Sequence, residues 1–186
     1  MAFDYPVFLD LTNVRVLLVG GGAVAERKLA GLAAAGAQVT VVAPVVTEGV
    51  VRMAAHVRRR PYAAGDCGGH QLVIAATDDP AVNAAVAAEA RAAGVWVNSA
   101  DDPANCTFTL PAVVRRGPVV AAVGTGGASP ALASYLRDRI AVEVVDERVE
   151  QAAAELARQR AAIRAAGGST EDVDWADRIR VALGDA

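Results

Sequence analysis

Val14-Arg-Val-Leu-Leu-Val19 runs directly into Gly20-Gly-Gly-Ala-Val-Ala25, and this stretch decides the fold. An apolar run that enters a glycine turn and continues as an Ala-rich segment predicts a buried strand, a tight turn and a helix. Gly20 permits the turn, and Gly22 lets the backbone approach a pyrophosphate. The free amides at the start of the helix, with the helix dipole behind them, favour phosphate groups. The alternative is a glycine turn with a structural role only, and the flanking elements argue against it.

Strands and helices alternate along the first part of the chain. The order strand, helix, strand, helix, strand, strand, helix, strand predicts right-handed crossovers and an α/β fold with a Rossmann-type doubly wound parallel sheet. Asp78-Asp79-Pro80 is expected to cap a helix from about Ala81 to Ala93. The further strands are expected at Gln38 to Ala43, His56 to Arg60, Gln71 to Thr77 and Val95 to Asn98.

Ligands of such sheets bind at the carboxyl ends of the strands. This rule places four segments along one rim of the sheet. They are Gly20 to Ala25, Ala43 to Val45, Thr77 to Asp79 and Asn98 to Asp102.

The chain changes character after this part. Thr107 to Val123 is expected to form two extended segments, joined by a turn at Arg115-Arg116-Gly117-Pro118, as antiparallel additions to the sheet. Ser129 and Pro130 begin a helix that runs to about Val145. The rest is helical, with one break at Gly167-Gly168-Ser169. We therefore expect an NAD-binding Rossmann domain over residues 1–113, a dimerisation segment over 114–145 and a small C-terminal helical subdomain over 146–186.

The helix after Pro130 has an apolar face with no evident partner, formed by Leu132, Leu136 and Ile140. Burial between two copies of the chain would cover this face, so we expect a homodimer. The alternative is that the terminal helices fold back over the same surface.

Composition limits the class of protein. The chain has 186 residues, of which 54% are hydrophobic, and a net charge of -3. This charge argues against a general nucleic-acid surface. Long apolar runs and a signal peptide are both missing, so we expect a cytoplasmic protein that does not bind a membrane. Cys67 and Cys106 lack metal or disulfide spacing, and His56 and His70 do not cluster, so we expect no fixed metal site.

Several segments together resemble the precorrin-2 dehydrogenase family, which also forms the N-terminal module of bifunctional siroheme synthase. The resemblance covers roughly residues 4 to 145, in the same order and at compatible spacing. Because no methyltransferase half follows, the chain resembles the stand-alone form. The segments that carry the resemblance are Tyr5 to Leu11, Gly20 to Lys28, Ala75 to Asn83, Val97 to Phe108 and Gly126 to Ala133.

The resemblance implies NAD-dependent oxidation of precorrin-2 to sirohydrochlorin, and it leaves open a ferrochelatase activity that inserts ferrous iron to give siroheme. Asp101 matches the family's essential aspartate, where a carboxylate could accept a proton. From spacing alone, Asp101 reads equally well as a turn residue. Asp102 fits the turn role better.

The resemblance also implies which residues hold NAD: the pyrophosphate turn, the end of the second strand near the adenosine, and a segment beside the nicotinamide. An Asp or Glu that would bind the ribose is missing, because Val42-Ala43-Pro44 stands at its position. No Arg at residues 43 to 47 could meet a 2'-phosphate, so NAD is expected over NADP. The expected contacts are Gly20, Gly21, Gly22, Ala23, Val24, Ala25, Pro44, Val45, Thr77 and Asp78.

The tetrapyrrole substrate carries several carboxylates, which arginine side chains bind well. Candidate substrate residues are Asn98, Arg115, Arg116, Arg137 and Ser129, the last matching a serine that the bifunctional family member can carry phosphorylated. For the arginines, the alternative is a solvated surface role, and for Ser129 it is the helix cap. Arg58 to Arg60 are expected to protect an edge strand. A second class of function, a dinucleotide-sensing regulatory module without catalysis, would need no acid at Asp101.

Overall fold

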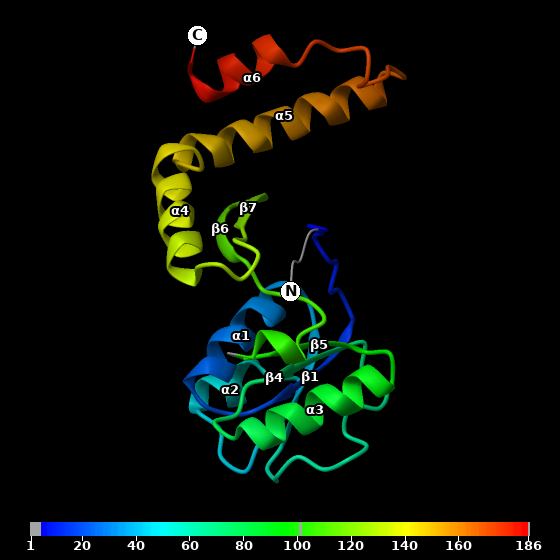
Figure 1. Ribbon diagram of the computed structural model, residues 1–186. Helices are drawn as coiled ribbons and strands as arrows, with labels where there is room; N and C mark the ends of the chain where they lie inside the picture. The colour runs from blue at the N-terminus through cyan, green and yellow to red at the C-terminus, as the bar shows by residue number, and fades with distance from the viewer. Residues whose placement is uncertain (1–4, 101, 186) are drawn as a thin grey trace. The chain divides into compact units, whose positions relative to one another are not determined.

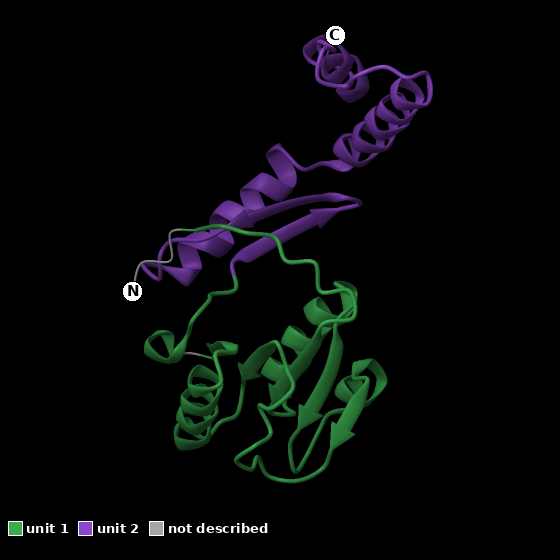
Figure 2. Cartoon of the chain, turned by 90° about the vertical axis from the view of Figure 1, so that its right-hand side faces the viewer, with its two compact units in different colours: residues 1–110 green, residues 111–186 purple. Residues whose placement is uncertain are grey.

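The computed structural model describes residues 5–100 and 102–185. The chain divides into two compact units, residues 1–110 and residues 111–186 (Figure 2). Each unit has its own sheet.

The first unit is built on a five-stranded sheet in the order β3-β2-β1-β4-β5, in which every neighbouring pair is parallel. Figure 1 labels β1, β4 and β5 of this sheet. The expected doubly wound sheet and the expected order of its elements are confirmed. The strands are β1 (Arg15–Val19), β2 (Gln38–Val42), β3 (His56–Arg58), β4 (Leu72–Ala75) and β5 (Trp96–Ser99), and the helices are α1 (Ala23–Ala34), α2 (Glu48–Met53) and α3 (Pro80–Ala92).

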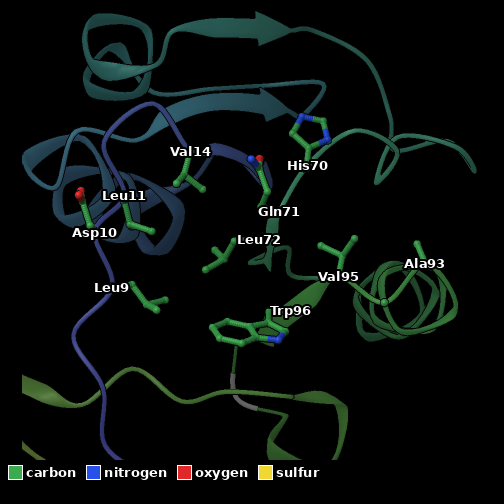
Figure 3. Close-up of a pocket in the computed structure, with 11 residues that line it drawn as sticks. Leu9, Asp10, Leu11, Val14, His70, Gln71, Leu72, Ala93, Val95 and Trp96 are labelled. Carbon is green, nitrogen blue, oxygen red and sulfur yellow. The ribbon is translucent and has the colours of Figure 1, made fainter.

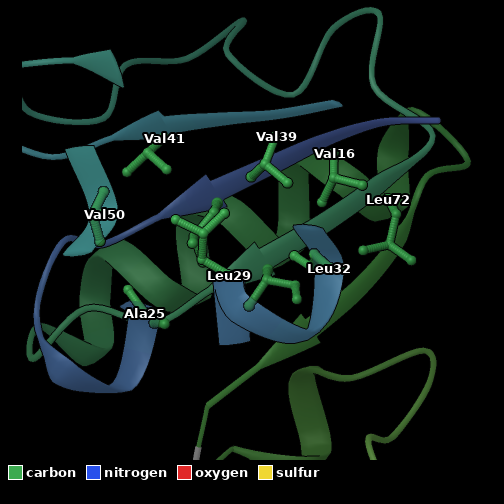
Figure 4. Packing of buried hydrophobic residues seen from close by; sticks show 11 residues of the cluster. Val16, Ala25, Leu29, Leu32, Val39, Val41, Val50 and Leu72 are labelled. Atoms are coloured by element: carbon green, nitrogen blue, oxygen red, sulfur yellow. The ribbon is translucent and has the colours of Figure 1, made fainter. Parts of the chain in front are cut away.

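Alternate residues of the central strands point to opposite faces of the sheet, and both faces are buried. Val16 and Leu18 of β1 pack with Leu29 of α1 and Val50 of α2 on one face (Figure 4). The other face of β1 packs against α3 through Val86, Ala87 and Ala90. A central parallel strand buried on both faces has to be apolar throughout, which is why this run could be recognised from sequence.

The connection from β3 to β4 is a loop, and it covers part of the α3 face. Its Asp66 carboxylate is buried and binds the guanidinium groups of Arg58 and Arg60, at 3.4 and 2.5 Å. The hydrogen bond from Arg60 holds the pKa of Asp66 below its usual value. β3 is an edge strand, as expected. The arginines do more than protect it, because they also fasten the loop.

A second set of contacts ties the same loop to α3. The Tyr62 hydroxyl donates to Glu89 of α3, and Glu89 also accepts from the amides of Gly65 and Cys67. Burial alone would raise the pKa of Glu89, but these hydrogen bonds outweigh it and lower the pKa below its usual value. Burial also raises the pKa of the Cys67 thiol, to about 11. This loop therefore does the covering that a crossover helix does elsewhere.

The second unit contains a hairpin and three helices. The hairpin, β6 (Ala112–Arg116) and β7 (Val119–Val123), turns at Gly117-Pro118 and forms a separate two-stranded sheet. α4 (Pro130–Glu143) and α5 (Glu147–Ala165) pack on it, and α6 (Ala176–Leu183) packs on α5. The expected break in the C-terminal helical region lies between α5 and α6.

The prediction that the hairpin extends the main sheet is wrong. The outer edge of β5 already has a partner, because Thr107 Oγ1 accepts from the Val97 amide at 2.7 Å and the Thr107 amide donates to the Val97 carbonyl at 2.8 Å. The segment from Thr107 to Leu110 forms no strand, and the first extended segment begins only at Ala112. A strand recognised by its residues can pair with either of two sheets, and only the tertiary structure chooses between them.

Candidate functional site

The described residues of the four rim segments expected from sequence do lie at one edge of the first unit, and Asp101 of the fourth segment lies outside the described residues. Parallel pairing aligns Val19 of β1 with Val42 of β2 and Ala75 of β4, and aligns Ala75 with Ser99 of β5. The residues that follow these strand ends therefore form one continuous row. In open α/β sheets, ligands bind at this edge.

Two of the three glycines are required by close backbone approach. Gly20 has a φ of +123°, and a Cβ there would lie 2.2 Å from the carbonyl oxygen of Ala76. A Cβ on Gly21 would lie 2.2 Å from the carbonyl oxygen of Val45. Because these glycines lack a Cβ, the backbone of the turn can pass close to the residues that follow β2 and β4. They therefore determine the shape of the rim at this point.

Gly22 is different, because a Cβ there would meet nothing within 4 Å. Gly22 is the N-cap of α1, with φ -83° and ψ -171°, and it has no side chain to bond the first amides of the helix. Ala23 and Val24 are exposed, whereas Ala25 is fully buried against the sheet. The open space therefore lies where the amides and positive dipole end of a 12-residue helix point, which is the arrangement that binds phosphate.

The loop after β2 lies beside this turn. Pro44 and Val45 are exposed, Val45 by 79%. Thr47 fixes the loop: its amide donates to the Gly21 carbonyl at 3.0 Å, and its hydroxyl donates to Glu26 of α1 at 2.5 Å. An exposed apolar surface on a fixed loop can carry the flat face of an adenine ring.

Thr77 and Asp78 follow β4, and a buried asparagine holds this segment. Asn83 of α3 accepts from the amide and the hydroxyl of Thr77 at 3.1 and 2.8 Å, and donates to the Thr77 carbonyl at 3.0 Å. Asp79 accepts from the amides of Ala81 and Val82 and caps α3, while Asp78 is exposed. Thr77 is thus held rigidly, and Asp78 is left on the surface of the rim.

Asn98 lies near the carboxyl end of β5 and is buried, with 6% of its surface exposed. Its Oδ1 accepts from the Lys28 ammonium of α1 at 3.2 Å, and its Nδ2 donates to the Phe108 carbonyl at 3.1 Å. Ser99 follows, and its buried hydroxyl has no hydrogen-bond partner in the described part of the chain. The end of β5 is therefore buried and polar, whereas Trp96 and Val97 before it are apolar.

Asp101 lies outside the described residues, but hydrogen bonds hold the residues that follow it in the sequence, from Asp102 to Cys106. Cys106 is buried, and its thiol lies 3.3 Å from the carbonyls of both Ser99 and Asp102. Asp102 accepts from Asn105 at 2.6 Å, in keeping with the turn role expected for it. Arg91 of α3 binds Ala104 and Asn105.

The remaining candidates belong to the second unit. Arg115 is exposed, and the Nε of Arg116 is buried without a hydrogen-bond partner among residues 5–100 and 102–185. Arg137 forms an ion pair with its neighbour Asp138. Ser129 accepts from the Leu132 amide at 3.1 Å and is the N-cap of α4, the alternative role that the sequence left open.

A hollow of about 500 Å³ lies at the opposite edge of the first unit, at the amino ends of β1, β4 and β5 (Figure 3). Its walls are mostly apolar and include Leu9, Leu72 and Trp96. It does not coincide with the rim. In the described residues, no group of His, Cys, Asp and Glu side chains is arranged to hold a metal ion, and no helix is long and apolar enough to cross a membrane.

Comparison with known families identifies the first unit. Residues 7–112 match the family described as "Putative NAD(P)-binding". The chain belongs to this NAD(P)-binding family. The open space at Gly22 and the uncapped start of α1 are what a dinucleotide pyrophosphate requires, so the residues fit this cofactor.

Similar proteins extend the comparison over the whole chain. Siroheme synthase of Methylococcus capsulatus is 51% identical over 142 residues, which cover 74% of this chain and 30% of the relative. Siroheme synthase of Methylobacillus flagellatus is 39% identical over 97% of this chain and 40% of its own length. The chain thus spans well under half of these curated relatives.

A solved structure titled "SirC, precorrin-2 dehydrogenase" has a TM-score of 0.73 and 29% identity, and the match covers 97% of this chain and 88% of that one. These comparisons confirm the family resemblance read from the sequence motifs.

Sequence reasoning missed three residues that the structure places at the rim: Lys28, Asn83 and Cys106. All three lie in segments that resembled the family. Their roles depend on partners elsewhere, since Lys28 meets Asn98 across 70 residues of sequence. Local patterns carry no signal for such a contact.

Proposed function

We propose that this protein oxidises precorrin-2 to sirohydrochlorin with NAD as hydride acceptor. One observation carries the proposal: the open space at Gly22 and the buried amide of Asn98 lie on the same strand-end rim. A solved structure that matches 97% of this chain and is titled a precorrin-2 dehydrogenase supports it. The NAD-binding part rests on the family itself.

In this proposal, different rim residues bind different parts of NAD. The amides of Gly22, Ala23 and Val24 bind the pyrophosphate, Pro44 and Val45 support the adenosine, and the rigidly held Thr77 stands beside the nicotinamide. NAD supplies the acceptor for the hydride. Binding at fixed positions converts the hydride transfer into an effectively unimolecular step.

Asp101 takes the proton that leaves the tetrapyrrole as the hydride departs, and Asn98 orients the substrate beside it. The loop after β5 suits this role, because hydrogen bonds from Cys106 to the Ser99 carbonyl and from Arg91 to the Ala104 carbonyl hold the residues around it in place. A general base gains about 100-fold or more from such positioning. Arg115, Arg116, Arg137 and Ser129 are proposed to meet the substrate carboxylates.

NAD is proposed over NADP because the residues directly after β2 offer no cationic side chain and no side-chain hydrogen-bond donor to the 2'-phosphate of NADP. Pro44 and Val45 are exposed and uncharged. Removal of pyrrole protons by Asp101 would also serve insertion of ferrous iron as a second substrate. Both reactions would take place in the cytoplasm, where NAD is available.

The test is incubation of the protein with precorrin-2 and NAD while sirohydrochlorin absorbance is followed. We expect NAD-dependent product formation, loss of most turnover in Asp101→Ala, and unchanged NAD affinity in that variant. A protein that binds NAD but forms no sirohydrochlorin would instead be a dinucleotide-sensing module. Addition of ferrous iron to the product mixture tests the chelatase step separately.

We also propose that residues 114–145 form a homodimer interface. α4 exposes Leu132, Tyr135 and Val142, whose spacing puts them on one side of the helix, and an exposed group of apolar side chains often marks a protein–protein contact. Light scattering at micromolar concentration should give about twice the 19.0 kDa chain mass. Leu136→Glu should lower that mass, and a wild-type mass near one chain would refute the dimer.

A further inference from the structure

Lysine is used once in this chain, at position 28, although lysine and arginine together number 18. Every other basic position is arginine. Arginine and lysine carry the same charge but differ in shape, so the contact that this lysine makes can depend on its geometry as well as on its charge. The side chain of Lys28 is partly buried rather than solvated.

The structure shows that Lys28 makes a contact between α1 and β5. Lys28 lies in the second turn of α1, one turn beyond Val24, and its ammonium reaches β5 to donate to Asn98 Oδ1 at 3.2 Å. Asn98 aligns with Ile74 of β4, whose side chain belongs to the α1 face of the sheet. Asn98 therefore points toward α1, and Lys28 meets it from there.

This contact sets the orientation of the Asn98 amide. The Nδ2 end donates to the Phe108 carbonyl at 3.1 Å and lies 3.6 Å from Cys106 Sγ, while the Oδ1 end accepts from Lys28. A carboxamide flipped by 180° would set its NH₂ group against an ammonium and its oxygen against a carbonyl. Lys28 thus excludes the wrong orientation as well as favouring the right one.

An ammonium is a compact donor at the end of a flexible stem, whereas a guanidinium is wide, planar and longer. At a partly buried contact with the Asn98 amide oxygen, the compact ammonium fits, whereas the wider and longer guanidinium would place its nitrogen atoms at other positions. Asn98 lies on β5, and Asp101, the residue proposed as base, follows it by three positions in the sequence.

We propose that Lys28 is a positioning residue for the substrate end of this site, which acts by holding the Asn98 amide in one orientation. The inference rests on the proposed function, since Asn98 is assigned there to the substrate. It adds a residue of α1 that contributes to turnover without binding NAD.

The kinetic test compares Lys28→Met with Arg27→Met, a matched control in which the neighbouring exposed arginine of the same helix is changed. We expect Lys28→Met to lower kcat/KM tenfold or more, with the NAD dissociation constant and Tm nearly unchanged, and Arg27→Met to stay within twofold of wild type. Lys28→Arg should not restore the rate. Rescue by arginine would show that charge alone matters, and would overturn the positioning role.

A double-mutant cycle tests whether Lys28 acts through Asn98. In an Asn98→Ala background, Lys28→Met should cost almost nothing further. Full additivity of the two losses would overturn the proposal, and so would wild-type kcat/KM in Lys28→Met alone.

A spectroscopic test does not depend on turnover. Protein labelled with ¹⁵N-lysine should give one side-chain ammonium signal, because there is one lysine, and Asn98→Ala should shift it while Arg27→Met should not. If the wild type fails to oxidise precorrin-2, the proposed function fails on its own. The lysine signal then decides the present inference, which is overturned if Asn98→Ala leaves that signal unmoved.

Discussion

Replacement of Gly22 by Asp should stabilise the protein and at the same time strongly weaken NAD binding. Gly22 is the N-cap of α1, in the extended backbone conformation that a capping Asp adopts, and a Cβ there would meet open space. An aspartate cap would bond the first amides of the helix and oppose its dipole. These effects together are worth about 0.5–1 kcal/mol, or about 1–4 °C in Tm for a chain of this size.

The same carboxylate would stand where the pyrophosphate is proposed to bind. Two unit charges 4 Å apart interact by about 4 kcal/mol at the effective dielectric constant typical of a protein surface. Since about 1.4 kcal/mol corresponds to a tenfold change in affinity, NAD binding should weaken at least about 100-fold.

Calorimetric titration with NAD and thermal unfolding of the same sample measure the two effects. Gly20→Ala is the contrasting variant: its Cβ would lie 2.2 Å from the Ala76 carbonyl oxygen at a φ of +123°. It should cost about 2–6 kcal/mol of stability from strain and overpacking. Wild-type NAD affinity in folded Gly22→Asp would refute the placement of the pyrophosphate, and a lowered Tm would refute the cap.

Three further outcomes are expected. Asp66→Asn should lower stability at pH 7 by about 1.5–3 kcal/mol in urea unfolding. Because the folded-state pKa of Asp66 is depressed by Arg60, this difference should be present above about pH 4 and fade as the pH falls below it; an equal difference at pH 3 would contradict the ion pair. With its pKa raised to about 11 by burial, Cys67 should react with iodoacetamide at pH 8 some hundred-fold slower than a free thiol, as followed by mass spectrometry, and rapid labelling of the native protein would argue against burial. Asn83→Ala leaves the Thr77 amide and carbonyl without their partner, so it should cost about 1–3 kcal/mol and weaken NAD binding, whereas an unchanged Tm would show that Asn83 does not hold the loop.

The parallel sheet could be predicted because its signals are local. The run from Val14 to Val19, the glycine turn and the Asp79-Pro80 cap each identify an element from neighbouring residues, and the alternation of strands and helices then indicates a parallel sheet with right-handed crossovers. The rim followed from that arrangement. The glycines could be ranked only with coordinates, since sequence does not show that a Cβ at Gly20 meets backbone and one at Gly22 meets nothing.

What could not be predicted depends on contacts between distant segments. The hairpin was recognised as two strands, but its exclusion from the main sheet depends on Thr107, which occupies the edge of β5. Arg58 and Arg60 looked like edge protection because nothing local shows that Asp66 would be buried between them. The Lys28–Asn98 contact joins a helix and a strand that periodicity treats independently.

The position of β1 in the sheet affects the order in which a newly made chain can fold. β1 is paired on one side with β2, which follows it closely, and on the other side with β4, where Arg15 and Gln71 are 56 residues apart. At the usual pace of about 5–20 residues per second, synthesis delivers β4 roughly 3–11 s after β1. During that interval the edge of β1 that pairs with β4 has no partner strand. An unpaired apolar edge can pair with another chain and aggregate, so this edge is the part of the nascent chain that we expect a chaperone to protect.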